Sequence, residues 1–200
     1  MLYRVAKVVL WPIFKVAYRF SAKNGQRLPV DGPVLIVANH ASYLDPVVIG
    51  LAARRPVRFM AKEQLFKIFG LGWIISRLYA FPVKRDVFDR RAIHTALLAL
   101  SEGGVVGIFP QGTRQKDGVT EAFPGAAMIA YKSGATVVPA AISGTEKIMP
   151  EGARLPRWPR IVVSFGEPIE PDVTGDKKEV IARLTDRIVE ELKVMLEQST

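Results

Sequence analysis

The chain lacks cysteine altogether. Disulfides, thiolate metal sites and a cysteine nucleophile are therefore excluded, and the composition fits a reducing compartment. No G-x-S-x-G nucleophile elbow is present, and neither a dinucleotide fingerprint nor a cluster of metal-ligating residues is visible. Internal repeats, low-complexity tracts and a second-domain linker are also missing. These absences predict one domain that uses neither a covalent cysteine intermediate nor a bound metal or cofactor.

Positive charge is what the chain has in excess. It carries 28 Lys and Arg against 19 Asp and Glu, for a net charge of +9 and a pI near 9.9. Such a balance favours an anionic partner, which can be nucleic acid, an anionic membrane surface or a phosphorylated substrate. No recognised nucleic-acid-binding motif is present, and an apolar N-terminus has no purpose in such a protein. We therefore expect no nucleic-acid partner.

Residues 1–24 predict an amphipathic helix that associates with a membrane. Arg4, Lys7, Lys15 and Arg19 fall within about one third of the circumference of a helix. A helix across the bilayer would leave these charges in hydrocarbon, at about 2.5 to 3.5 kcal/mol each near the centre. A helix that lies in the interface exposes the charges to anionic headgroups and the apolar side chains to acyl chains. A helix packed on the protein core is the alternative.

Residues 25–200 predict a single α/β domain. Short apolar runs alternate with segments of helical period, which indicates a mixed, largely parallel sheet flanked by helices. The expected strands are 33–38, 57–61, 80–83, 105–109, 136–142 and 161–165. The expected helices are 46–53, 63–78 with a break near Gly70, 87–102, 125–132 and 177–198. In such a sheet, the loops after the strands form the usual ligand crevice.

The loop after the first of these strands holds a candidate catalytic pair, His40 and Asp45. A neutral imidazole accepts a proton near neutral pH, which suits a general base for a hydroxyl. A carboxylate on the far ring nitrogen fixes the tautomer and stabilises the imidazolium that forms. Asp45 is also a good N-cap, because Pro46 and an apolar run follow it. Catalytic pairing and simple capping therefore both remain open.

A second loop, 109–114, reads Phe-Pro-Gln-Gly-Thr-Arg. Gly112 permits close approach of the backbone to a ligand, and Thr113 offers a hydroxyl. Arg114 supplies a planar fork that can hold a phosphate through two hydrogen bonds. The loop predicts an anion clamp, although a turn of this composition also occurs in inert loops. The loops that contain His40, Arg85 and Arg114 all follow predicted strands, so we expect them to converge.

These residues carry a resemblance to a known family. Asn39-His40 through Asp45 matches the NHxxxxD block of the glycerolipid acyltransferases, and 109–114 resembles their FPEGTR block. Residues 80–85 are similar to the second block and 138–142 to the fourth. The blocks occur in order, and the resemblance covers about residues 25–165. With its small size and N-terminal helix, the chain resembles the bacterial 1-acyl-sn-glycerol-3-phosphate acyltransferases.

The resemblance implies an enzyme that transfers a fatty acyl group to the 2-hydroxyl of lysophosphatidic acid and forms phosphatidic acid. Acyl-CoA or acyl carrier protein would be the donor, with no further cofactor. His40 would be the base and Asp45 its orienting partner. Arg85 and Arg114 would hold the glycerol phosphate, and 111–113 would shape the loop. We expect the enzyme at the cytoplasmic face of the cell membrane, as a peripheral or monotopic protein.

Several positions leave alternatives open. Gln111 stands where the family usually has Glu, so another lysophospholipid is a possible acceptor. Lys62 is a further phosphate-binding candidate, or else a solvated residue at a helix start. The Arg54–Arg58 cluster can face solvent, phospholipid or coenzyme A, and we expect a surface role for His94. A non-catalytic, basic membrane-binding protein is the rival class, but it leaves His40, Asp45 and Arg114 unexplained.

Overall fold

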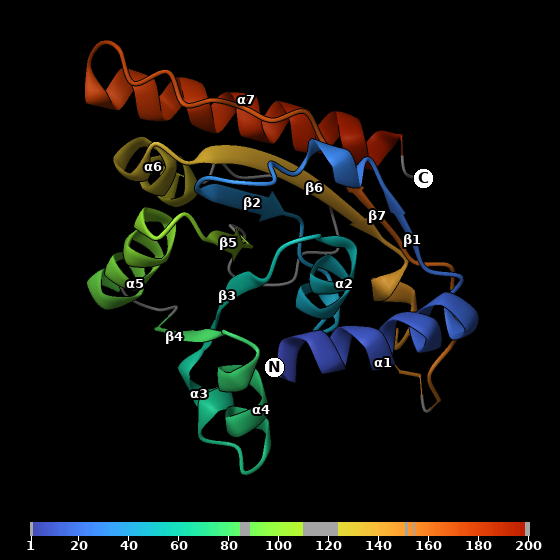
Figure 1. Ribbon diagram of the computed structural model, residues 1–200. Helices are drawn as coiled ribbons and strands as arrows, with labels where there is room; N and C mark the ends of the chain where they lie inside the picture. The colour runs from blue at the N-terminus through green and yellow to red at the C-terminus, as the bar shows by residue number, and fades with distance from the viewer. Residues whose placement is uncertain (1, 85–88, 110–123, 151, 154, 199–200) are drawn as a thin grey trace.

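A seven-stranded mixed sheet with helices on both faces makes up the fold (Figure 1). The computed structural model describes residues 2–84, 89–109, 124–150, 152, 153 and 155–198. The strands are β1 (Ser21–Lys23), β2 (Val34–Ala38), β3 (Val57–Lys62), β4 (Phe81–Val83), β5 (Val105–Ile108), β6 (Thr136–Ser143) and β7 (Val162–Phe165). The helices are α1 (Leu2–Ala17), α2 (Asp45–Ala52), α3 (Glu63–Phe66), α4 (Leu71–Arg77), α5 (Arg90–Ser101), α6 (Pro124–Ser133) and α7 (Lys177–Glu197), with short 3₁₀ turns at Gly25–Arg27 and Thr145–Lys147.

The sheet has the strand order β1-β7-β6-β2-β5-β3-β4. β2, β3, β4, β5 and β6 run parallel to one another, while β7 pairs antiparallel with β6 and parallel with β1. The prediction of a mixed, largely parallel sheet in an α/β domain is confirmed. The predicted strands and helices also agree with the described elements to within a few residues, including the break at Gly70 that separates α3 from α4.

The two faces of the sheet bury separate apolar clusters. β2 shows the division best, because all five of its residues are buried. Val34, Ile36 and Ala38 belong to the cluster that includes residues of α1 and α2, whereas Leu35 and Val37 belong to the cluster with α5, α6 and α7. Alternate residues of a strand point to opposite faces, so a strand that is apolar throughout is covered on both sides.

The N-terminal segment differs in part from its prediction. α1 is present but ends at Ala17, and residues 21–23 form β1, which pairs with Val162–Ser164 of β7. A helix throughout residues 1–24 was therefore a wrong expectation. Ser-Ala-Lys has no apolar periodicity, and its extended conformation depends on pairing with a strand about 140 residues away in the sequence. None of the described helices is long and apolar enough to traverse a bilayer.

Candidate active site

His40 and Asp45 form a direct hydrogen-bonded pair. His40 lies two residues beyond the end of β2, and Asp45 is the first residue of α2. The Nδ1 atom of His40 lies 2.8 Å from Oδ2 of Asp45. Because a carboxylate only accepts hydrogen bonds, the ring donates from Nδ1 and its basic lone pair is on Nε2. The predicted pairing of His40 with the carboxylate of Asp45 is therefore present.

Asp45 is fully buried and does not cap α2. The N-cap of this helix is Leu44. The backbone N–H groups of Ala41 and Ser42 each donate to Oδ2 of Asp45 at 2.7 Å, and the Thr145 hydroxyl donates to Oδ1 at 2.6 Å. An ionised carboxylate away from water requires such donors, and charge-assisted hydrogen bonds are among the stronger ones in proteins. The capping alternative is excluded, because the carboxylate accepts hydrogen bonds from residues 40–42, before the helix, and from Thr145, which follows β6.

Asn39 fixes the start of the same loop to a neighbouring strand. Its Nδ2 donates to the carbonyl of Ile142 at 2.9 Å, and the backbone N–H of Ile142 donates to its Oδ1 at 2.8 Å. The side-chain amide thus completes a two-bond pair with a residue of β6. Since β2 and β6 are parallel neighbours, this pair holds the chain in place directly before His40.

An aromatic stack lies against the His40 imidazole. The His40 ring stacks on Phe109 with centroids 4.3 Å apart, and the ring of Phe59 from β3 also stacks with Phe109, at 5.7 Å between centroids. The His40 side chain is only 6% exposed. Burial away from water strengthens the hydrogen bond between His40 and Asp45.

The carboxyl ends of the parallel strands bring several predicted residues to one edge of the sheet. His40 follows β2, Lys62 is the last residue of β3, and Thr145 follows β6. Each of these strands is parallel to its neighbour in the central block, so the three positions share the edge where ligands usually bind in such sheets. Arg85 and Gln111, Gly112, Thr113 and Arg114 lie outside the described residues, although β4 and β5 end shortly before them.

The remaining basic candidates have separate environments. Lys62 is exposed at the edge that carries His40, which suits contact with an anion. Arg55 donates to the carbonyls of Pro29, Gly32 and Gly103, so it has a structural role. Arg58 forms an ion pair with Glu102 at 3.0 Å.

Two further observations concern the second histidine and possible metal ligands. His94 is exposed on α5, as expected, where it lines a surface hollow of about 350 Å³. In the described ranges, no three His, Cys, Asp or Glu side chains gather closely enough to hold a metal ion.

Sequence reasoning missed the supporting roles of Thr145, Asn39 and Phe59. Thr145 is one hundred positions from Asp45 in the sequence, so no local pattern connects the two. Its position just beyond a buried strand was the available signal, because polar residues there tend to line the ligand crevice. Asn39 was within a recognised block, but only the register between β2 and β6 shows what its amide binds.

Comparison with known proteins gives a consistent result. The acyltransferase family profile matches residues 19–143. The chain is 31% identical over 173 residues to the 1-acyl-sn-glycerol-3-phosphate acyltransferase of Bacillus subtilis, an alignment that covers 85% of this chain and 84% of that protein. It is 34% identical over 154 residues to the chloroplastic enzyme LPAT1 of Arabidopsis thaliana, covering 74% of this chain but only 41% of the plant protein.

A solved structure supports the same relationship. The crystal structure of the 1-acyl-sn-glycerophosphate acyltransferase PlsC from Thermotoga maritima superposes with a TM-score of 0.69 at 32% identity. The match covers 95% of this chain and 82% of that one. Together with the matched profile and the paired His40 and Asp45, these similarities show that the chain belongs to the acyltransferase family.

Proposed function

We propose that this protein transfers a fatty acyl group from a thioester donor, acyl-CoA or acyl carrier protein, to the 2-hydroxyl of lysophosphatidic acid. The product would be phosphatidic acid. The observation that carries the proposal is the buried hydrogen bond between His40 and Asp45, which equips the chain with an oriented base. The relatives in Bacillus subtilis and Thermotoga maritima, named for this activity, support the choice of acceptor.

The reaction needs no covalent enzyme intermediate. The acceptor hydroxyl attacks the thioester carbonyl while Nε2 of His40 takes its proton, and the tetrahedral intermediate collapses as the C–S bond breaks. The thiolate leaves and recovers a proton from the imidazolium, so the ring returns to its neutral form. Asp45 stabilises the imidazolium between these steps. Lys62, Arg85 and Arg114 would hold the phosphate, with Gln111, Gly112 and Thr113 shaping the loop beside it.

The proposed location is the surface of an anionic membrane, at its cytoplasmic face. α1 supports this position with three distinct faces. Tyr3, Leu10 and Phe14 turn toward the protein, while Val5, Val9, Ile13 and Val16 are each half exposed or more. Arg4 and Lys15 are exposed on the flank between these faces. A helix with an exposed apolar face and a basic flank is typical of one that lies in the interface.

A panel of purified donors and acceptors tests the proposal. Wild-type protein is incubated with acyl-CoA or acyl carrier protein and with lysophosphatidic acid or a lysophospholipid with another headgroup, and the product is identified by mass spectrometry. We expect phosphatidic acid. His40→Ala should lower turnover by roughly 100-fold to 10,000-fold, while the exposed His94→Ala serves as the matched control. Unchanged turnover in His40→Ala would discard the assigned base.

The same panel decides the alternatives that Gln111 leaves open. If the enzyme prefers another lysophospholipid, that lipid is the acceptor in place of lysophosphatidic acid, and the proposed role of His40 is unchanged. Binding to anionic vesicles without transfer from any donor would instead favour the non-catalytic membrane-binding class.

A further inference from the structure

The segment between β3 and β4 exposes an unusual amount of apolar surface. Five large apolar side chains are exposed within seven residues, and Phe69 is completely open to solvent. They are Ile68, Phe69, Leu71, Trp73 and Ile74. We call residues 67–74 the α3–α4 tip. Single exposed apolar residues are ordinary, but a contiguous group of this kind marks an interaction surface.

The α3–α4 tip has a defined shape. Gly72 is buried against α3, and a Cβ atom there would lie 2.2 Å from the carbonyl oxygen of Phe66. The N–H of Gly72 also donates to the carbonyl of Ile68 at 3.0 Å. Gly70 has a φ of 76°, which suits glycine and reverses the chain between the two helices. The close approach of α3 to α4 therefore presents the apolar side chains on a fixed turn.

Basic groups flank the apolar side chains. Lys67 and Arg77 are exposed in this segment, as is Lys62 directly before it. The segment has one acidic residue, Glu63. The Arg77 guanidinium lies 4.8 Å from the centroid of the Trp73 ring. This combination matches the successive layers of an anionic bilayer. Apolar side chains suit the acyl region, tryptophan suits the interface, and cations suit the headgroups.

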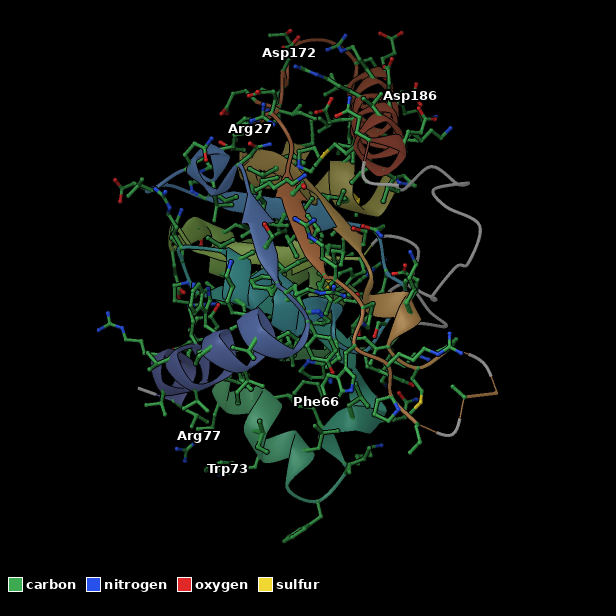
Figure 2. All side chains as sticks on the ribbon, turned by 90° about the vertical axis from the view of Figure 1, so that its right-hand side faces the viewer. Arg27, Phe66, Trp73, Arg77, Asp172 and Asp186 are labelled. Atoms are coloured by element: carbon green, nitrogen blue, oxygen red, sulfur yellow. The ribbon has the colours of Figure 1, made fainter. Side chains whose placement is uncertain are left out.

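The α3–α4 tip lies at the end of the molecule that also carries α1. In both views the α3–α4 segment forms the lower end and α7 the upper end (Figures 1 and 2). Figure 2 shows Trp73 and Arg77 below α1, with Asp172 and Asp186 at the opposite end. The rings of Tyr3 and Tyr79 lie 6.0 Å apart and connect the start of α1 with the end of this segment. α3 also begins directly after Lys62, at the edge of the sheet that carries His40.

We infer that the α3–α4 tip is a second membrane-insertion site, with an anionic phospholipid bilayer as its partner. The inference rests on the proposed function and extends it, because two contacts restrict how the protein lies on a surface whereas one helix leaves it free to rotate. Phe69 and its apolar neighbours enter the acyl region, and Lys67 and Arg77 contact the headgroups. The edge with His40 is thereby held near the lipid that supplies the acceptor.

Vesicle binding of charge-inserting variants tests the inference. Phe69→Glu is compared with Val194→Glu, an exposed apolar position on α7 at the other end of the molecule, using vesicles of phosphatidylglycerol and phosphatidylcholine. We expect Phe69→Glu to weaken the partitioning of the protein onto vesicles about tenfold or more. The substitution removes a large apolar group and introduces a negative charge, which the anionic headgroups repel. Val194→Glu should bind as wild type. Unaltered melting of both variants confirms that they are folded, and equal partitioning would overturn the inference.

Fluorescence provides a second measurement. In a Trp11→Phe, Trp158→Phe double variant, Trp73 is the remaining tryptophan of the three. Vesicles with brominated acyl chains should quench its emission. If the protein binds vesicles and the emission of Trp73 is not quenched, the inference is overturned. It is also overturned if Phe69→Glu leaves vesicle binding unchanged and only abolishes self-association in sedimentation velocity, since the partner of this surface would then be a second copy of the protein.

A monomeric acceptor separates this inference from the proposed function. When the acceptor is short-chain lysophosphatidic acid below its critical micelle concentration, Phe69→Glu should retain acyl transfer. When the acceptor is presented in vesicles, the same variant should lose acyl transfer. If wild type fails to acylate this acceptor, the proposed function is contradicted and the binding result for the α3–α4 tip still stands. If Phe69→Glu loses activity equally in both settings, the α3–α4 tip acts on catalysis itself and the inference fails.

Discussion

At the scale of single residues, Asp45 explains why His40 has one defined orientation. The carboxylate has no exposed surface, and its two oxygens accept hydrogen bonds from two separate parts of the chain. Residues 40–42, in the loop before α2, donate to Oδ2 through the His40 imidazole and two backbone N–H groups, and the Thr145 hydroxyl donates to Oδ1. Any rotation of the carboxylate breaks several of these bonds together. The local sequence supplies the pair, and the fold supplies its rigidity.

Thr145 provides a test of this positioning role. Thr145→Val keeps the shape of the side chain but removes the O–H that donates to Asp45 at 2.6 Å. We expect kcat to fall about tenfold, because a buried carboxylate that loses a donor is misplaced or destabilised. Thr145→Ser should restore most of the activity. Steady-state kinetics measure both variants, and a rise in KM with unchanged kcat would assign Thr145 to substrate binding instead.

Gly107 of β5 supports the ring stack beside His40. A Cβ atom at this position would lie 2.3 Å from Cε1 of Phe59, the ring that stacks on Phe109. Gly107→Ala should therefore displace Phe59, disturb the stack next to His40 and lower both activity and melting temperature. Gly125→Ala is the control, since a Cβ there meets nothing within 4 Å. Activity and calorimetry on the two variants check this, and equal behaviour would show that β5 absorbs the added carbon.

At the scale of secondary-structure elements, the N-terminus of α5 has a pH-dependent cap. Asp89 accepts backbone hydrogen bonds from Lys84, Arg91 and Ala92, and these bonds lower its pKa below the ordinary value of 3.8, with the bonds to Lys84 and Ala92 first among the causes. A carboxyl with a depressed pKa in the folded state stabilises that state above its ordinary pKa. This contribution is lost as the pH falls through the lowered value.

Asp89→Asn should isolate this effect. The amide can still cap the helix but does not titrate in this range. We expect wild type to be the more stable protein near pH 6 and the difference to shrink as the pH falls below about 4. Urea unfolding across this range measures the difference. A constant difference between the two proteins would show that the charge of Asp89 does not contribute.

The elements also show how far the sequence alone could predict this structure. The strand β2 was predictable because a fully buried strand is apolar at every position, and the pairing of His40 with Asp45 because five residues fit within one loop. β1 was not predictable, since three residues without a pattern became a strand only through β7. The role of Thr145 depends on the parallel pairing of β2 with β6, which places residues one hundred positions apart at the same edge.

At the scale of the whole molecule, α1 belongs to the domain as well as to the proposed membrane surface. Phe14 is buried and packs against Tyr18 and Phe20, with ring centroids 5.1 and 6.5 Å away. Tyr3 donates to the carbonyl of Gly50, and Lys7 to that of Ala53, at the end of α2. The helix is therefore fixed to the body of the protein at both ends. We expect it to unfold together with the sheet.

Two adjacent residues of α1 separate these roles. Phe14→Ala should destabilise the whole chain by about 3 to 5 kcal/mol, as expected for removing a buried aromatic ring. Ile13→Ala, on the exposed face, should change stability by less than about 0.5 kcal/mol but weaken binding to anionic vesicles. Denaturant unfolding and vesicle sedimentation measure the two properties. A similar loss of stability in both variants would mean that the outer face of α1 is also packed.

The two margins of the sheet are formed by β1 and β4, each three residues long. Enzymes concentrated on a two-dimensional surface meet one another often, and long unpaired strands would then template polymerisation between neighbouring copies. Margins this short offer few free backbone groups for such growth. Short edge strands therefore limit strand pairing between copies of the protein that lie close together on a lipid surface.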